Sequence, residues 1–476
     1  MATDADGGML AAMIQELDRA RSASGHIGLV RRYLRGDHDI PYMPRGADRE
    51  YEAIARASIT NFLPLISGTF GRQLYVDGYR SGRSASNAPA WDVWVANRMA
   101  ARQAIAMQGA IDYGVAYVAV EGETIRPLSP RKSWAWYEDD DAEFPIAGLA
   151  EVGIRYGPRG EILRRFELWY GSTVTTHEQV TGIRAGEARD PACDDDSIQV
   201  GRLVQIDSRT HQYSHVPWVR FRDRVDDVAL GVVRPLIPAQ DRVNASVFYM
   251  LMALHYASFR QRWATGLKIP RDTQEELPDG RPNPNFGRPI EPFRAAVDRL
   301  WVSESPETRF GDFSQTDVSG HLAAISDAIM ALLTLGRSSP LLGAGNSISN
   351  IAIESVAALN ASMNAQIESF QTNFGVSWDT VLELTGRSVP GATVRWRDNE
   401  PRSFSQVVDG LLKLSQMGAP ARGLFEMVPG ITDVQLEQWL RLAEEESEPD
   451  RALYSAIAQA QAARSQTPAD PTPEAE

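Results

Sequence analysis

Few residues of this chain have the types and spacing that chemistry requires, and the first of them are two histidines. His211 and His215 lie four positions apart, a spacing that puts two imidazoles on one face of an α-helix, where they can share a metal ion. Pro217 and the β-type residues that follow disfavour a helix at this position. We therefore expect two separate surface histidines.

Two acidic runs could hold a divalent cation through their carboxylate oxygens. They are the EDDD run at 138–141 and the DDD run at 194–196. Neither has the glycine and the distal glutamate of an EF-hand loop, and adjacent carboxylates repel one another, so we expect solvated loops. Ion binding at a subunit interface and a metal-assisted hydrolase that uses these runs with His211 or His215 are the alternatives.

A glycine-rich stretch, GAGNSIS at 343–349, could bind a phosphate group through backbone N–H groups at the start of a helix. Ile348 occupies the place of the remaining glycine of a dinucleotide-binding fingerprint. The sequence contains no GxxxxGK[ST] loop. We therefore expect no catalytic residues, no cofactor and no bound metal, and the isolated protein should neither bind nor hydrolyse ATP.

Length and charge limit the classes of protein that remain. The chain has 476 residues, which is enough for two or three domains with a sizeable core. Its formal net charge of -14 disfavours broad adhesion to DNA or anionic lipid, because such adhesion depends on Lys and Arg. An acidic wall with few cations would still suit a conduit in which DNA slides.

The cysteine content and the hydropathy of the chain indicate the cellular compartment in which the protein is expected. Cys193 is the only cysteine, so no intrachain disulfide can form and a reducing cytoplasm is expected. The first ten residues lack the basic and apolar regions of a secretory signal. The uncharged run 243–259 is shorter than the roughly 20 apolar residues of a membrane helix, so we interpret it as a buried helix.

The predicted secondary structure that positions these residues changes along the chain from helices to strands. Apolar residues at helical spacing predominate up to residue 110, and β-branched runs separated by Gly, Asp and Pro turns follow from 114 to 221. The predicted helices are 9–21, 27–35, 51–70 and 91–111, and the predicted strands are 115–120, 148–156, 164–170, 172–177 and 198–206.

Two apolar stripes with alternating steps of four and three predict a pair of long helices. The segment 263–313 between them is rich in Pro, Gly, Arg and Asp, and it should form a long excursion. A third, longer helix is expected from about Asn350, with further helices after Trp396 and a disordered tail at 464–476. The stripes are Val243, Val247, Met250 and Leu254 in the first helix, and Val318, Leu322, Ile325 and Ile329 in the second.

Taken in order, these segments resemble the portal proteins of long-tailed, siphovirus-type bacteriophages. HVPWVRFRDR at 215–224, Gly231 and PAQDRVN at 238–244 resemble the start of that family's stem, and WVSESPETRFGDFSQTD at 301–317 resembles the return from its clip. Upstream, YLRGDHDIPY at 33–42, NFLPLISGTFGRQLYVDGYR at 61–80 and DYGVAYVAV at 112–120 occur in the family's order.

The resemblance implies an α+β, mainly α-helical portal fold that assembles as a ring around a central channel. The implied wing is 1–233, helical to about 110 and mixed β at 114–221. A first stem helix at 234–262, a clip at 263–316 and a second stem helix at 317–336 follow. The remaining parts are a tunnel loop at 337–349, a long helix returning to the wing at 350–395, a crown at 396–463 and a disordered tail at 464–476.

The function that the resemblance implies is that of a dodecameric ring at one capsid vertex, through which DNA is packaged and ejected. Its expected partners are further copies of itself, double-stranded DNA without sequence specificity, terminase, the major capsid or scaffold protein and a head–tail adaptor, with no membrane. Its expected location is the virion, after assembly in the host cytoplasm. Another phage head–tail connector ring component is an alternative, although those are generally much shorter than 476 residues.

Two sets of residues carry the implied roles. The stripe residues of the two stem helices should contact neighbouring subunits, because a two-helix stem has more apolar surface than it can bury alone. The tunnel-loop residues expected to contact DNA are Arg337, Ser338, Ser339, Asn346, Ser347 and Ser349.

Overall fold

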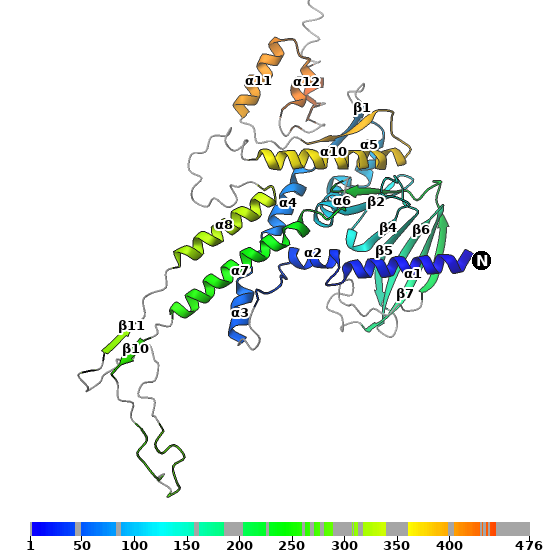
Figure 1. Cartoon of the computed structure of the whole chain (residues 1–476). Helices are drawn as coiled ribbons and strands as arrows, with labels where there is room; N and C mark the ends of the chain where they lie inside the picture. Colours follow the sequence, from blue (N-terminus) through cyan, green and yellow to red (C-terminus); the bar gives the residue numbers. More distant parts are fainter. Residues whose placement is uncertain are drawn as a thin grey trace, which may run out of the picture. The chain divides into compact units, whose positions relative to one another are not determined.

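The computed structural model shows a chain of mixed helix and sheet that divides into two compact units (Figure 1). The larger unit comprises Met1–His38, Asn61–Gln240 and Met330–Glu476, and the smaller comprises Asp39–Thr60 and Asp241–Ile329. The structure describes residues 2–42, 49–81, 87–156, 161–184, 203–224, 228–258, 262–266, 271–276, 280–288, 307, 309–312, 318–338, 360–397, 404–428, 431, 435–436 and 438–443.

Helices predominate before residue 114, as the sequence predicts. The helices predicted at 9–21 and 27–35 are confirmed by α1 and α2. The two longer predictions, 51–70 and 91–111, are wrong as single helices, because each range contains two. The bounds are α1 Ala2–Arg21, α2 His26–Leu34, α3 Arg49–Ala57, α4 Leu63–Gln73, α5 Ala90–Ala96 and α6 Met99–Tyr113.

Side-chain amides accompany the first interruption. The Phe62 N–H donates to Gln240 Oε1 at 3.0 Å, and the Thr60 N–H donates to Asn244 Oδ1 at 3.1 Å, so the backbone leaves the helix before α4. Between α5 and α6, Arg98 adopts a left-handed conformation with φ 55°. Neither amide contact can be read from local spacing, because the partners lie far apart in sequence.

Two antiparallel sheets follow. The three-stranded sheet has the order β3-β2-β9, and the five-stranded sheet has the order β4-β5-β6-β7-β8. The first three predicted strands fall within observed strands, and the fourth, 172–177, starts one residue before β7. The fifth, 198–206, overlaps β8, which begins at Leu203 among the described residues. The bounds are β2 Val115–Glu121, β3 Thr124–Leu128, β4 Ser133–Trp136, β5 Ala147–Tyr156, β6 Glu161–Tyr170, β7 Thr173–Arg184, β8 Leu203–Thr210 and β9 Trp218–Arg222.

The five-stranded sheet is covered on both faces. On one face α1 lies across the strands, and its Met13 and Leu17 pack with Leu149 and Phe166 (Figure 1). The other face meets the three-stranded sheet through a cluster that includes Trp169 and Trp218. A Cβ at Gly148 would lie 2.8 Å from the Trp218 ring, so only glycine permits this approach of the two sheets.

The long helix α10, Ala361–Leu384, is held by aromatic side chains. Trp378 is fully buried, with its ring centroid 4.7 Å from that of Phe221 in β9 and 4.9 Å from that of Trp94 in α5. The start of the helix predicted near Asn350 and the predicted tail at 464–476 lie outside the described residues. The remaining elements of this unit are β1 Val76–Ser81 paired with β12 Ala392–Trp396, the short 3-10 helix Pro130–Lys132, α11 Phe404–Gln416 and α12 Ala421–Glu426.

The two stripe helices are α7, Val233–Ser258, and α8, Ser319–Leu335. The first begins at Val233, one residue before the predicted start of the first stem helix at 234. Pro238 lies inside it, at the loss of one backbone hydrogen bond. A short antiparallel pair, β10 Arg262–Thr265 and β11 Arg309–Asp312, joins the two ends of the predicted excursion, with Arg262 one residue before its start. No helix among the described residues is long and apolar enough to cross a membrane.

A buried charge cluster joins α1 to the five-stranded sheet. Arg164, which is 0% exposed, donates to Asp18 at 2.7 and 2.8 Å and to Glu151 at 3.2 Å. Arg21 binds the same Glu151 carboxylate at 2.7 Å. Burial raises the pKa of Glu151, but the charges of Arg21 and Arg164 outweigh it and the net pKa is lowered.

This lowered pKa predicts acid sensitivity. Because the folded-state pKa of Glu151 lies below its unfolded value, its contribution to stability is present above about pH 4.3 and is lost as the pH falls through the folded pKa. Urea unfolding monitored between pH 7 and pH 3 should show a steeper loss of stability for the wild type than for Glu151→Gln. Parallel pH profiles for the two proteins would contradict the assignment.

Candidate functional site

The predicted channel segment begins where α8 ends. The Gly336 N–H donates to Leu332 O at 2.9 Å and the Ser338 N–H donates to Leu333 O at 3.0 Å, which closes the helix. Arg337 between them is left-handed, with φ 49°, and its guanidinium donates to the side-chain amide of Gln366 in α10. The last turn of α8 is therefore tied to the long helix.

The structure describes two of the six predicted tunnel-loop residues, Arg337 and Ser338, and their side chains differ in exposure. Arg337 is exposed, whereas Ser338 is 6% exposed and its hydroxyl oxygen has no hydrogen-bond partner among the described residues. Contact between Ser338 and a DNA phosphate would require that hydroxyl to become exposed. Ser339, Asn346, Ser347 and Ser349, like the GAGNSIS stretch, lie outside the described residues.

The eight predicted stem contacts also differ in exposure. Val243 is fully buried within the chain, so its side chain is not available to a neighbouring subunit and we withdraw it from the set. Leu322 is 56% exposed and Leu254 is 40% exposed, so these two present the most apolar surface. Val247, Met250, Val318, Ile325 and Ile329 are half-buried.

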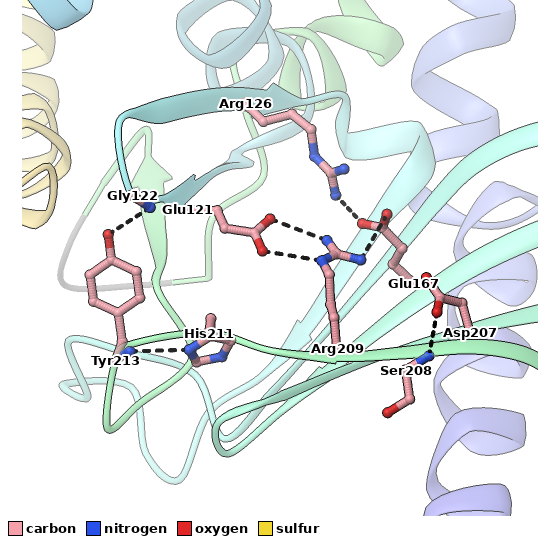
Figure 2. Close-up of polar contacts among 9 residues, drawn as sticks. All are labelled: Glu121, Gly122, Arg126, Glu167, Asp207, Ser208, Arg209, His211 and Tyr213. Atoms are coloured by element: carbon pink, nitrogen blue, oxygen red, sulfur yellow. Dashed lines mark hydrogen bonds and ion pairs between the residues drawn. The ribbon is translucent and has the colours of Figure 1, made fainter.

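A polar network that the sequence analysis missed surrounds the turn between β2 and β3 (Figure 2). Arg209 of β8 donates to both carboxylate oxygens of Glu121, at 3.1 and 3.2 Å, and lies 3.7 Å from Glu167. The guanidinium carbons of Arg209 and Arg126 lie 5.5 and 6.0 Å from the Trp169 ring centroid. The network thus connects the two sheets through paired charges above one indole.

The same turn also contacts α10. The Gly122 N–H donates to the Tyr213 hydroxyl at 3.1 Å, and that hydroxyl donates to Leu384 O at 2.8 Å (Figure 2 shows the first contact). Glu123 forms an ion pair with Arg387, which follows α10. One four-residue turn therefore joins β8, the loop after it and the C-terminal end of α10.

The two histidines do not form a pair. His211 stacks on Trp169 at 5.6 Å and its Nδ1 accepts the Tyr213 N–H at 3.3 Å, whereas His215 stacks on Phe144 at 3.8 Å. Burial lowers the pKa of both. Within the described ranges there is no group of three or more His, Cys, Asp or Glu side chains that could hold a metal ion. The acidic run 194–196 lies outside those ranges.

The sequence matches the family model described as phage portal protein, SPP1 Gp6-like, over residues 24–450. The chain therefore belongs to this phage portal protein family, which is structural rather than catalytic. No curated protein matches the sequence.

Two solved structures are similar to this chain. One is the virion of a native gene transfer agent particle, at 12% identity and a TM-score of 0.36, with 82% of this chain and 94% of that chain covered. The other is the neck of an empty gene transfer agent particle, at 11% identity and a TM-score of 0.37, with 80% and 91% covered.

The Tyr213 contacts give a testable prediction. Tyr213→Phe removes one acceptor and one donor, and it leaves the Gly122 N–H and the Leu384 carbonyl without this partner, at a cost of about 1–3 kcal/mol. Hydrogen exchange of the β2–β3 turn should accelerate. The control is Tyr156→Phe, at a side chain that is 66% exposed, where exchange should not change. Equal exchange of the turn in both variants would contradict the role of Tyr213.

Proposed function

We propose that this portal protein assembles as a homo-dodecameric ring at one vertex of the capsid and forms the channel through which DNA is packaged and ejected. The family match over residues 24–450 is the observation that supports this proposal most strongly. The exposed Leu322 and Leu254 on the stripe helices agree with it, because a closed ring would cover such side chains.

The elements suggest how the parts of the ring are divided. The proposed wing (1–233) holds both larger sheets and α1, and α7 and α8 form the proposed stem at 234–262 and 317–336. The pair β10–β11 belongs to the proposed clip (263–316). The tunnel loop is 337–349, the long helix and the return to the wing are 350–395, and α11 and α12 belong to the proposed crown (396–463).

The proposed partners follow from this position. Double-stranded DNA passes through the channel without being read, and terminase, capsid or scaffold protein and a head–tail adaptor bind the ring from outside it. The tunnel loop contains one cation, Arg337, among hydroxyl and amide side chains, which suits weak contact with a moving phosphate backbone. The ring forms in the host cytoplasm and remains in the virion.

Electron microscopy of the purified protein in negative stain is the direct test. Rings with a central hole are expected, and light scattering after size exclusion gives the subunit number. A monomer at all concentrations tested would refute the ring.

The exposure of Leu322 predicts a variant that separates folding from assembly. Leu322→Asp should fold, since the side chain is 56% exposed, but it should not form rings, because a carboxylate buried between subunits costs several kcal/mol. The control is Ala324→Asp, about 200° around the same helix. Rings of both variants, measured by size exclusion with light scattering, would show that this face of α8 is not a subunit contact.

The low cation content of the tunnel loop predicts the effect of adding charge. Ser339→Lys combined with Asn346→Lys should leave ring assembly unchanged but slow DNA translocation, since each subunit would attract phosphates more strongly. Raising the salt concentration should partly restore the yield of packaged DNA. An unchanged yield and salt response, measured with heads built from the variant, would mean that this loop does not face DNA.

A further inference from the structure

His26 connects the ends of two other helices through its two ring nitrogens. It is the first residue of α2, and its Nε2 lies 2.8 Å from the main-chain oxygen of Tyr113 at the end of α6. Its Nδ1 lies 3.2 Å from Nη1 of Arg234, which is in the first turn of α7. One imidazole ring therefore holds the end of α6 and the start of α7 together.

These two partners determine the protonation state of the ring. A carbonyl oxygen only accepts hydrogen bonds, so Nε2 of His26 carries the hydrogen and donates it to Tyr113 O. A guanidinium only donates, so Nδ1 carries a lone pair and accepts from Arg234. Both contacts exist together only for the neutral ring in this one tautomer. A proton added at Nδ1 would remove the acceptor and place two positive charges against each other.

The surroundings also favour the neutral ring. His26 lies at the amino-terminal end of α2, where the helix dipole disfavours a cation. Burial is the largest influence and lowers the pKa of His26, and the charge of Arg234 lowers it further. The hydrogen bond to Tyr113 O and the charge of Asp223, which follows β9, act in the opposite direction without outweighing them. The phenol of Tyr113 stays neutral, because burial raises its pKa.

The turn before α2 fixes the place of the ring. The Gly25 N–H donates to Ser22 O at 2.9 Å, and a Cβ at Gly28 would overlap the same carbonyl group, so α2 begins directly against the end of α1. The backbone that carries His26 therefore has little freedom to move the ring away from Arg234. Repulsion between the two groups would act on the start of α7 instead.

Two main-chain hydrogen bonds lie just before α7 and report on how firmly its start is held. The Val232 N–H donates to Ile111 O at 2.7 Å, and the Gly231 N–H donates to Asp223 Oδ2 at 3.1 Å. Both amides are within three residues of Arg234. Their protection from exchange with solvent depends on the free energy needed to open this segment.

We propose that His26 is a pH-sensitive clamp on the start of α7: the neutral ring holds Arg234, and protonation at Nδ1 releases the first turn of the helix. This inference goes beyond the proposed ring and does not depend on it, because the contacts of the clamp all lie within the larger compact unit.

The sign of the pH dependence follows from the direction of the pKa shift. Because the folded-state pKa of His26 is lowered, the stability that the neutral ring contributes is complete above about pH 6.5. It decreases as the pH falls from there toward the folded pKa. The start of α7 is thus held at neutral pH and released in mild acid.

Hydrogen exchange of the full-length protein tests the clamp. Corrected for the intrinsic effect of pH on exchange, the protection of the Gly231 and Val232 amides should fall about tenfold between pH 7.5 and pH 5 in the wild type. His26→Gln should show no such fall, because an amide side chain donates and accepts but does not titrate. The control is His215→Gln, which removes the histidine that stacks on Phe144 and should leave the response of the wild type unchanged.

Arg234→Met removes the group that the clamp holds. Its two reporter amides should be poorly protected at both pH values, at about the level of the wild type at pH 5. Constant protection in the wild type would overturn the proposal, and so would a fall that persists in His26→Gln, since Asp223 or another group would then be responsible. A simultaneous loss of protection throughout the five-stranded sheet would also overturn it, because acid would then unfold the whole unit rather than release one helix.

Discussion

The aromatic packing of α10 against β9 determines where the other functional elements of the larger unit lie. Trp378 contacts Phe221 on one side and Trp94 on the other, at ring separations of 4.7 and 4.9 Å. Aromatic side chains bury large areas and allow few alternative geometries, so this contact sets both the position and the rotation of α10. Gln366, which binds Arg337 at the end of α8, is on the same helix, so its position depends on this contact.

Buried charge supplies specificity elsewhere in this unit. The cluster of Arg21, Arg164, Glu151 and Asp18 contributes less to stability than its short distances suggest, because desolvation opposes the attraction. Its consequence is orientation, since α1 can satisfy Arg164 in only one register on the sheet. The network at the β2–β3 turn acts similarly at the opposite face, where Arg209 links β8 to Glu121. Both faces of one sheet are thus held by charge pairs as well as apolar contact.

Much of the architecture could be predicted from sequence, for identifiable reasons. The stripes of α7 and α8 and the alternating runs of β2 and β6 are periodic patterns, and periodicity is local information. The break near Asn61 was missed because it depends on Gln240 and Asn244, which are distant in sequence. The sequence could not show that Leu322 is exposed while Val243 is buried. The spacing of apolar residues identifies one face of a helix but does not show what covers that face.

Arg337 meets two requirements that conflict: its backbone conformation favours glycine, whereas its side-chain contact needs a guanidinium. For a residue with a Cβ this conformation costs roughly 1–2 kcal/mol, and glycine would adopt it at almost no cost. The preceding residue is already glycine, so the chain has a residue suited to this conformation one position too early. The backbone at 337 therefore does not favour arginine. What favours it is the guanidinium, whose contact with Gln366 makes the residue type at this helix end a matter of side-chain chemistry rather than of turn geometry.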